Sequence, residues 1–256
     1  MRALTIDLNA DVGEAFGVYA MGADEELLPF VTSVNVACGF HAGDPRVIDR
    51  TVGLAVRAGV AVGAHPGHWD LRGFGRRAIP VSAEEVETDV VYQVGALQAF
   101  ARAHGVELSH VKPHGALYNQ AVADETLARA IARGVARVSR SLRFVGLASS
   151  EVMARAARDE GLAFGAEAFV DRSYNPDGSL RSRQLPDALI MDPERAAAQA
   201  VRLAREGHVL AWDGARVFVR ADTLCLHGDN PQAVDIAWAV RHALEQAGVT
   251  LQALGR

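Results

Sequence analysis

Short apolar segments and longer amphipathic segments alternate along the whole chain. Each short segment is a nearly continuous run of β-branched and other apolar residues, without strict alternation, which is typical of parallel strands buried on both faces. This pattern predicts seven strands and one additional hairpin strand. The seven strands are expected at residues 5–8, 33–37, 61–64, 108–111, 144–147, 163–168 and 224–226, and the hairpin strand at 217–219.

The segments between the predicted strands carry helix start and stop signals. Asp44-Pro45, Asp192-Pro193 and Asn230-Pro231 each place a capping side chain before a proline that suits the first helical turn. Ser82 and Glu85 have the spacing of a capping box. The helix ends are expected at glycines that favour the left-handed position after a helix. These are Gly59, Gly105, Gly161, Gly207 and Gly248.

Repeated strand–helix units in one chain predict an α/β fold with a parallel sheet. A closed TIM-like barrel fits both the 256-residue length and the regular alternation, so residues 1–256 are expected to form a single domain. An open doubly wound sheet is the alternative, but the GxGxxG fingerprint of such folds does not follow the first strand. The irregular polar stretches at 66–80 and 171–186 are expected to be lids or binding loops.

Composition excludes several classes of protein. Half of the residues are hydrophobic, 22% are charged and the net charge is −5, which indicates a globular protein without the basic surface that nucleic acids require. No stretch approaches the ~20 apolar residues of a membrane span, and Asp7, Asp11 and Glu14 interrupt any signal peptide. Two cysteines without CxxC spacing, Cys38 and Cys225, favour a reduced, cytoplasmic setting.

Basic residue usage points to one position. Of the 26 basic residues, 25 are arginine, and Lys112 is the only lysine. Lysine and arginine are largely interchangeable at solvated faces but not where a compact ammonium group is needed. Lys112 is therefore expected to have a specific role, with a lysine left over by mutational drift as the alternative. Because Pro113 follows it, the chain has no Walker A loop.

Polar and titratable residues collect at the carboxyl ends of the predicted strands, where the chemistry of parallel α/β folds takes place. A single histidine or aspartate at a strand end is more often a cap or a buried polar group than a catalyst. The interpretation therefore depends on six strand ends together. Their polar residues are Asn9, Asp11, Glu14, His41, His65, Lys112, His114, Glu167, Asp171, Arg172, His227 and Asp229.

Two chemistries fit such a rim. Asp11, His65 and His114 are the natural set for a divalent metal ion that activates water. Alternatively, carboxylates and imidazoles act as general acid and base beside Lys112, which neutralises negative charge. Spacing alone does not separate the two. Residues without a motif context are expected to be structural, namely His104, His110, His208 and His242. For Cys38 a small buried residue is expected, with a nucleophile as the alternative, because no activating base is identified near it in the sequence.

Seven motifs occur in order along the chain and carry a family resemblance. They are DLNADVGE at 7–14, NVACGFHAGDP at 35–45, GAHP at 63–66, GFGRR at 73–77, VKPHGALYN at 111–119, EAFVDR at 167–172 and HGDNP at 227–231. In these motifs the chain resembles the LamB/YcsF family, from about residue 5 to the C-terminal helix. One departure is the segment GHWD at 67–70, where a more proline-rich stretch is expected. The resemblance therefore does not predict the conformation of this loop or the substrate fit that depends on it.

The resemblance implies both a fold and a function. The fold is the irregular seven-stranded barrel of glycoside hydrolases and polysaccharide deacetylases. The family is identified with the A subunit of a prokaryotic ATP-dependent 5-oxoprolinase, which opens the lactam of 5-oxo-L-proline to L-glutamate. That reaction is coupled to hydrolysis of ATP to ADP and phosphate, and it involves subunits B and C. Without a P-loop, this chain is expected to bind ATP unconventionally or to share it with a partner.

The implied reaction assigns roles to the polar residues. A phosphorylated lactam needs cationic groups for its phosphoryl oxygens and its carboxylate, and a base to direct water. The residues expected to be catalytic are Asp11, Glu14, His41, His65, Lys112 and His114. Those expected to bind substrate or phosphate are Asn9, Arg76, Arg77, Asn119, Glu167, Arg172, His227 and Asp229.

Two other functions are compatible with the same residues. The first is a metal-dependent, deacetylase-like hydrolase of carbohydrates, which rests on analogy of fold and on the aspartate and histidine residues of the rim. The second is a non-catalytic subunit that binds substrate or acts as a scaffold for its partners. Metal analysis tests the first, and substitution of Lys112 tests the second.

Overall fold

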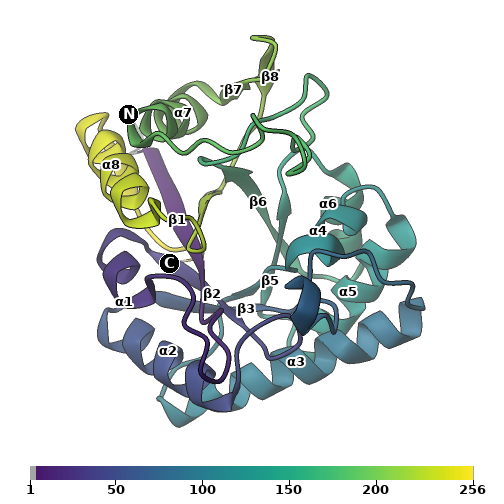
Figure 1. Cartoon of the computed structure of the whole chain (residues 1–256). Helices are drawn as coiled ribbons and strands as arrows, with labels where there is room; N and C mark the ends of the chain where they lie inside the picture. The colour runs from purple at the N-terminus through teal and green to yellow at the C-terminus, as the bar shows by residue number, and fades with distance from the viewer. Residues whose placement is uncertain (1–3, 256) are drawn as a thin grey trace.

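Seven parallel strands close into a barrel in the computed structural model of the chain, which describes residues 4–255 (Figure 1). Neighbouring strands follow the order β1-β2-β3-β4-β5-β6-β9, and β9 pairs back with β1. This confirms the predicted α/β barrel. The strands are β1 (Leu4–Val12), β2 (Ser33–Ala37), β3 (Ala61–His65), β4 (His110–Val111), β5 (Arg143–Leu147), β6 (Ala163–Phe169) and β9 (Thr223–His227).

Helices surround the barrel and cover the outward faces of its strands (Figure 1). Their apolar side chains pack on the strands in one continuous core. The α-helices are α1 (Asp24–Leu27), α2 (Pro45–Arg57), α3 (Ala83–Ala103), α4 (Gly115–Ala121), α5 (Glu125–Val138), α6 (Glu151–Asp159), α7 (Pro193–Glu206) and α8 (Ala233–Gln246), with short 3₁₀ turns at Leu28–Phe30 and Leu71–Gly73.

The predicted helix boundaries are confirmed with one exception. The side chains of Asp44 and Asp192 cap α2 and α7, and Ser82 with Glu85 forms the capping box of α3. The five predicted glycines all have positive φ, from 66° to 78°. The predicted cap at Asn230 is wrong: α8 begins at Ala233, and the Asn230 side chain instead accepts a hydrogen bond from the backbone of Gln232. The Asn230 side chain therefore stabilises a local turn before α8 instead of capping the helix.

The first strand is longer than its apolar run predicts. β1 continues past Leu8 to Val12. In a strand, side chains two residues apart lie on the same face. Asp7, Asn9 and Asp11 all make hydrogen bonds with residues of other barrel strands, so they face the interior. The apolar residues between them, including Ala10, face the helices. A strand that lines a polar barrel interior thus loses the continuous apolar pattern.

Further strand predictions change, and β4 begins at His110, two residues after its predicted start. β8 (Arg216–Phe218) is shifted by one residue from the predicted hairpin strand, and it pairs antiparallel with β7 (His208–Leu210) outside the barrel. β10 (Val249–Leu251) was not predicted; it pairs with the start of β1 as an eighth strand of the sheet. Cys38 and Cys225 are both free and buried. Among residues 4–255, no helix combines the length and the apolar character needed to cross a membrane.

Candidate functional site

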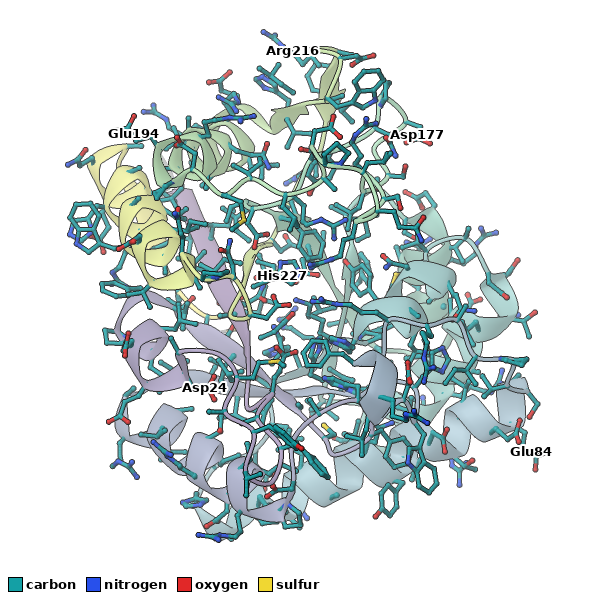
Figure 2. All side chains as sticks on the ribbon, viewed as in Figure 1. Asp24, Glu84, Asp177, Glu194, Arg216 and His227 are labelled. Carbon is teal, nitrogen blue, oxygen red and sulfur yellow. The ribbon has the colours of Figure 1, made fainter. Side chains whose placement is uncertain are left out.

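A cavity of about 560 Å³ lies at the carboxyl end of the barrel. Its wall combines residues from β1, β3, β9, the segment around α4, and the loop after β6. Figure 2 shows one lining residue, His227, near the middle of the barrel opening, whereas Glu84, Glu194 and Arg216 lie at the periphery. Six residues of the predicted polar rim line this cavity, namely Asp11, His65, Lys112, His114, Arg172 and His227.

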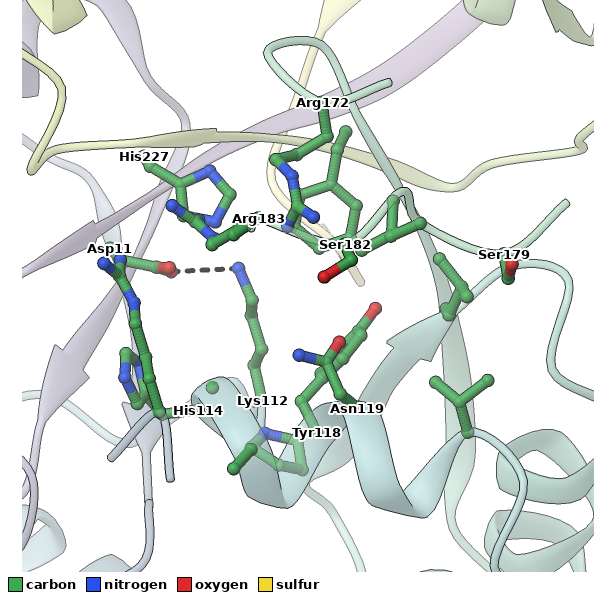
Figure 3. A pocket seen from close by; sticks show the side chains of 18 of the residues that line it. Asp11, Lys112, His114, Tyr118, Asn119, Arg172, Ser179, Ser182, Arg183 and His227 are labelled. Atoms are coloured by element: carbon green, nitrogen blue, oxygen red, sulfur yellow. Dashed lines mark hydrogen bonds and ion pairs between the residues drawn. The ribbon is translucent and has the colours of Figure 1, made fainter. Parts of the chain in front are cut away.

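Lys112 lies at the base of this cavity and is almost completely buried (Figure 3). Its Nζ lies 2.9 Å from Oδ1 of Asp11 and 3.0 Å from Oε1 of Glu167. The same atom lies 2.9 Å from Sγ of Cys225 and 5.4 Å from the centre of the Phe169 ring. We call Lys112, Asp11, Glu167 and Cys225 the lysine cluster. It joins β1, the end of β4, β6 and β9.

Side-chain amides in the barrel interior form hydrogen bonds that orient the lysine cluster. Asn35 donates to Oδ1 of Asp11 at 2.8 Å and to Oδ1 of Asn9 at 2.7 Å. The Nε2 of His110 lies 2.7 Å from the Asn35 oxygen and must donate to it, because that oxygen can only accept. Asn9 in turn donates to Thr223 and to Glu167. His110, expected to be merely structural, thus fixes the orientation of the amide that holds Asp11.

The charges in the lysine cluster stabilise one another. Burial opposes ionisation of Asp11, but the charges of His65 and Lys112 outweigh it and hold the pKa of this carboxyl well below its ordinary value. Burial likewise opposes the charged form of Lys112, but Asp11, Cys225 and Glu167 together raise its pKa well above the ordinary value. Burial raises the pKa of the Cys225 thiol, which therefore stays protonated. At neutral pH the cluster contains an ammonium group and an ionised Asp11.

A second buried group, which we call the histidine cluster, lies beside Asp11 and consists of Glu14, His41, His65 and His114. One possible ligand atom from each residue lies within 4.8 Å of the other three. The rings of His41 and His114 are stacked with centroids 3.7 Å apart, and Nδ1 of His114 lies 3.0 Å from Nε2 of His65. Oε1 of Glu14 lies 3.8 Å from nitrogens of both His41 and His114.

Burial controls the protonation of the histidine cluster. It lowers the pKa of His41 and of His114 well below the ordinary value, and neighbouring histidine charge adds to the effect. Burial raises the pKa of Glu14 well above its ordinary value, with the charges of Asp11 and Asp229 acting in the same direction. The predicted metal set Asp11, His65 and His114 is therefore divided: the two histidines join Glu14 and His41, while Asp11 pairs with Lys112 and lies 3.4 Å from His65.

Guanidinium groups line the opposite wall of the cavity. Arg76 pairs with Asp229 at 2.5 Å, and Arg172 donates to the backbone oxygens of Ala188 and Arg181. Arg183 makes no hydrogen bond or ion pair with any residue in the described range 4–255. Burial, followed by the charge of Arg183, lowers the pKa of Arg172 to about 10. This wall therefore holds one guanidinium group, that of Arg183, without a hydrogen bond or an ion pair among the described residues.

The remaining predicted site residues lie in different places. His227 lines the cavity, with its Nδ1 bonded to Asp171 at 2.9 Å. Asn119 is exposed and also borders the cavity. Arg77 does not: it pairs with Asp70, and its side chain is 64% exposed.

Sequence reasoning missed several contributors to the site. Cys225 had no motif, yet it contacts Lys112. The hydroxyl of Tyr118 is buried at the cavity and has no hydrogen-bond partner among residues 4–255. Arg183 lies in the loop 171–186, which the sequence marked as a binding loop without naming this residue. The pair of arginines at 181 and 183 in that loop was the available signal.

Comparison with known proteins gives consistent matches over nearly the whole chain. The family model described as LamB/YcsF family matches residues 6–256. A protein of Natranaerobius thermophilus, named as the A subunit of 5-oxoprolinase, is 51% identical over 98% of this chain and 97% of its own. A protein of the same name from Chloroflexus aggregans is 54% identical, over 97% and 98% of the two chains.

Solved structures agree with these matches. The crystal structure of a lactam utilization protein from Thermus thermophilus is 52% identical, with a TM-score of 0.93, and covers 98% of this chain and 100% of that one. A putative cellobiose-phosphate cleavage protein from Enterococcus faecalis is 12% identical, with a TM-score of 0.55, over 97% of each chain. At that identity the second likeness shows the fold alone.

Proposed function

The chain belongs to the LamB/YcsF family, and from this membership we propose that it is the lactam-opening subunit of an ATP-dependent 5-oxoprolinase. The relatives of similar length are named as the A subunit of 5-oxoprolinase. Its substrate would be 5-oxo-L-proline and its product L-glutamate. The enzyme would be a hydrolase of a cyclic amide that hydrolyses ATP to ADP and phosphate.

The observation that best supports the proposal is the charge arrangement of the cavity. 5-Oxoproline carries one carboxylate and one lactam carbonyl group. Arg183 is a guanidinium group without a protein carboxylate, and such groups bind carboxylates through paired hydrogen bonds. Lys112 lines the same cavity as a compact ammonium group held by Asp11 and Glu167. The two cations match the two oxygen-bearing ends of the substrate.

The lysine cluster suits an activated lactam. Transfer of the γ-phosphoryl group of ATP to the lactam oxygen makes the carbonyl carbon electrophilic. Water adds to that carbon, the carbon–nitrogen bond breaks with a proton passing to nitrogen, and a second water releases phosphate. We assign Lys112 to the negative charge that develops on the oxygens, because a preorganised cation in a dry site stabilises such charge strongly. We assign Asp11, which stays ionised, to orientation of the attacking water.

Partner subunits belong to the proposal. The name that the relatives carry implies a multi-subunit enzyme, and we propose subunits B and C as the partners. Because the sequence has no P-loop, we assign the main ATP contacts to the complex rather than to this chain alone.

The decisive experiment measures glutamate released from 5-oxoproline and ATP by this chain alone and with subunits B and C. We expect little or no turnover alone and robust turnover in the complex. Turnover by the purified chain alone would contradict the division of labour. Absence of turnover in a correctly assembled complex would contradict the proposed function.

Turnover assays of the same kind also test the two alternative functions. A purely scaffolding subunit predicts that Lys112→Ala leaves turnover unchanged wherever the complex assembles. A deacetylase-like hydrolase predicts release of acetate from acetylated sugars by the chain without ATP. That second function is supported by likeness of fold, which is a weak warrant for activity, and by the aspartate and histidine residues of the rim.

A further inference from the structure

The proton positions of two histidines follow from their backbone contacts. Nδ1 of His65 lies 2.7 Å from the carbonyl oxygen of Lys112, and Nε2 of His114 lies 2.8 Å from the carbonyl oxygen of Phe74. A carbonyl oxygen only accepts, so each of these nitrogens carries its proton. In a neutral imidazole the other nitrogen is then a bare lone pair. The bare nitrogens are Nε2 of His65 and Nδ1 of His114.

When both rings are neutral, these two bare nitrogens face each other at 3.0 Å, whereas a protonated His65 donates from Nε2 to Nδ1 of His114. Two lone pairs at that separation repel, and both rings are almost completely buried, which excludes relief by bulk water. A cation between or beside them converts the repulsion into attraction. The ionised carboxylate of Asp11, 3.4 Å from His65, supplies balancing negative charge, and a carboxyl oxygen of Glu14 lies 3.8 Å from His114.

His41 gives an independent indication that the histidine cluster binds a ligand. It is 1% exposed, and neither of its nitrogens has a hydrogen-bond partner among residues 4–255. Burying an imidazole without a hydrogen bond is costly. Glu14 also makes no hydrogen bond within the described residues. A buried imidazole and a buried carboxylate, both without hydrogen bonds, therefore lie beside the two facing lone pairs.

We propose that Glu14, His41, His65 and His114 bind a divalent transition-metal ion of the zinc class. Three imidazoles and one carboxylate are a donor set that suits Zn²⁺, and also Co²⁺ or Ni²⁺. The backbone carbonyls that fix the protonated nitrogens of His65 and His114 are the outer contacts typical of metal-binding histidines. This set differs from Asp11, His65 and His114, because Asp11 belongs to the lysine cluster.

Little rearrangement is needed for binding. His41 lies parallel to His114, so its ring must tilt to point a lone pair at a shared ion. That movement breaks no hydrogen bond, since its nitrogens make none with the described residues. When bound, such an ion polarises carbonyl oxygens or lowers the pKa of water. His65 and His114 both line the cavity, so the site borders the space available to substrate.

The test is metal binding by the chain alone, which does not depend on the proposed function. Protein freed of metal by a chelator is titrated with Zn²⁺ by calorimetry and with Co²⁺ by visible absorption. We expect one ion per chain, a higher thermal midpoint with Zn²⁺, and the absorption of a four-coordinate cobalt site. His41→Gln and Glu14→Gln are each expected to weaken binding by ~10-fold or more. His41→Gln removes no hydrogen bond to a described residue, so its metal-free form should remain folded, as circular dichroism checks.

His242→Gln is the matched control, because His242 is half-buried on α8, its ring lies against the Trp238 ring, and its side chain bonds only to the Trp238 carbonyl oxygen. This variant should bind Zn²⁺ as the parent protein does. If the protein takes up neither Zn²⁺ nor Co²⁺ stoichiometrically, the proposal is overturned. A proton shared between His65 and His114 then accounts for their contact. Equal weakening in His242→Gln would show surface binding and also overturn it. Loss of binding in Asp11→Asn with retention in Glu14→Gln would overturn the ligand assignment.

Discussion

Lys112 and Arg183 line the same cavity under opposite conditions. Lys112 is 2% exposed and lies within 3.0 Å of two carboxylates. Arg183 is half-buried on a loop, and none of the described residues gives it a hydrogen bond or an ion pair. Burial, followed by the charge of Arg76, lowers the pKa of Arg183, and the charges of Asp229 and Asp171 act in the opposite direction.

Lys112 and Arg183 therefore represent two roles of a charged side chain, one in folding and one in ligand binding. A paired buried charge is positioned by folding, and removing it leaves its partners uncompensated. An unpaired charge at a cavity contributes little to folding and retains its capacity for a ligand. The same contrast holds between His110, which is fully bonded in the barrel, and His41, which is not. Substitutions at each kind of position should therefore affect different quantities.

The largest effect is expected at Lys112. Lys112→Met should lower kcat/KM of the assembled complex by ~10²–10³-fold, as when one preorganised donor to an oxyanion is lost. The same change should reduce the free energy of unfolding by ~3–5 kcal/mol, because Asp11 and Glu167 keep their charge without a partner. Lys112→Arg should rescue poorly, since a planar guanidinium does not replace a compact ammonium. Near wild-type kcat/KM in Lys112→Arg would show that the lysine has no special role.

Arg183→Ala should raise KM for 5-oxoproline by ~10–100-fold, corresponding to a lost hydrogen bond to a charged group. We expect kcat and the free energy of unfolding to change little, because no described residue depends on Arg183 for a hydrogen bond. Steady-state kinetics and urea unfolding measure the two quantities. Loss of stability without a change in KM would reverse the assignment and place Arg183 among the structural charges.

Buried neutral histidines should make the metal-free protein sensitive to acid. Burial lowers the pKa of His110 to about 3, against an ordinary value of 6.5. Below pH 6.5 the unfolded chain binds a proton that the folded chain does not, so stability is complete above that pH and is lost as pH falls toward about 3. The loss reaches ~1.4 kcal/mol per pH unit for each such histidine. His41 and His114 act in the same direction.

His110→Gln tests this within the barrel. Glutamine retains a donor for the Asn35 oxygen but does not titrate, so the slope of unfolding free energy against pH should become shallower between pH 6.5 and about 3. Urea unfolding at several pH values, in the presence of a chelator, measures the slope. An unchanged slope would mean that His110 is charged in the folded protein.

The smallest effect is expected at Arg77, which is the control for Arg183. Its guanidinium group pairs with Asp70 and points away from the cavity. Arg77→Ala should change kcat/KM by no more than about twofold, the range of ordinary surface substitutions. A rise in KM as large as that of Arg183→Ala would restore the substrate-binding role that the sequence assigned to Arg77.

Local features of the fold were determined by the sequence alone. The caps at Asp44, Asp192 and Ser82 and the glycines after the helices depend on backbone groups a few residues away. The buried strands follow from short apolar runs, and the closed barrel follows from their number and order. The motifs at the strand ends marked the correct rim of the barrel. Each of these inferences needs only neighbouring residues and the general geometry of parallel strands.

Only the tertiary structure decided which side chains meet. Lys112 is 101 residues from Asp11 and 113 from Cys225, and their contacts depend on the register in which β1 and β9 pair. The fold also brings Glu14 and His41 to His65 at the end of β3 and His114 just before α4, and it places Arg183 at the cavity while Arg77 meets Asp70. Because a one-residue change of register moves every side chain to the other face of a strand, spacing along the chain could not specify these partners.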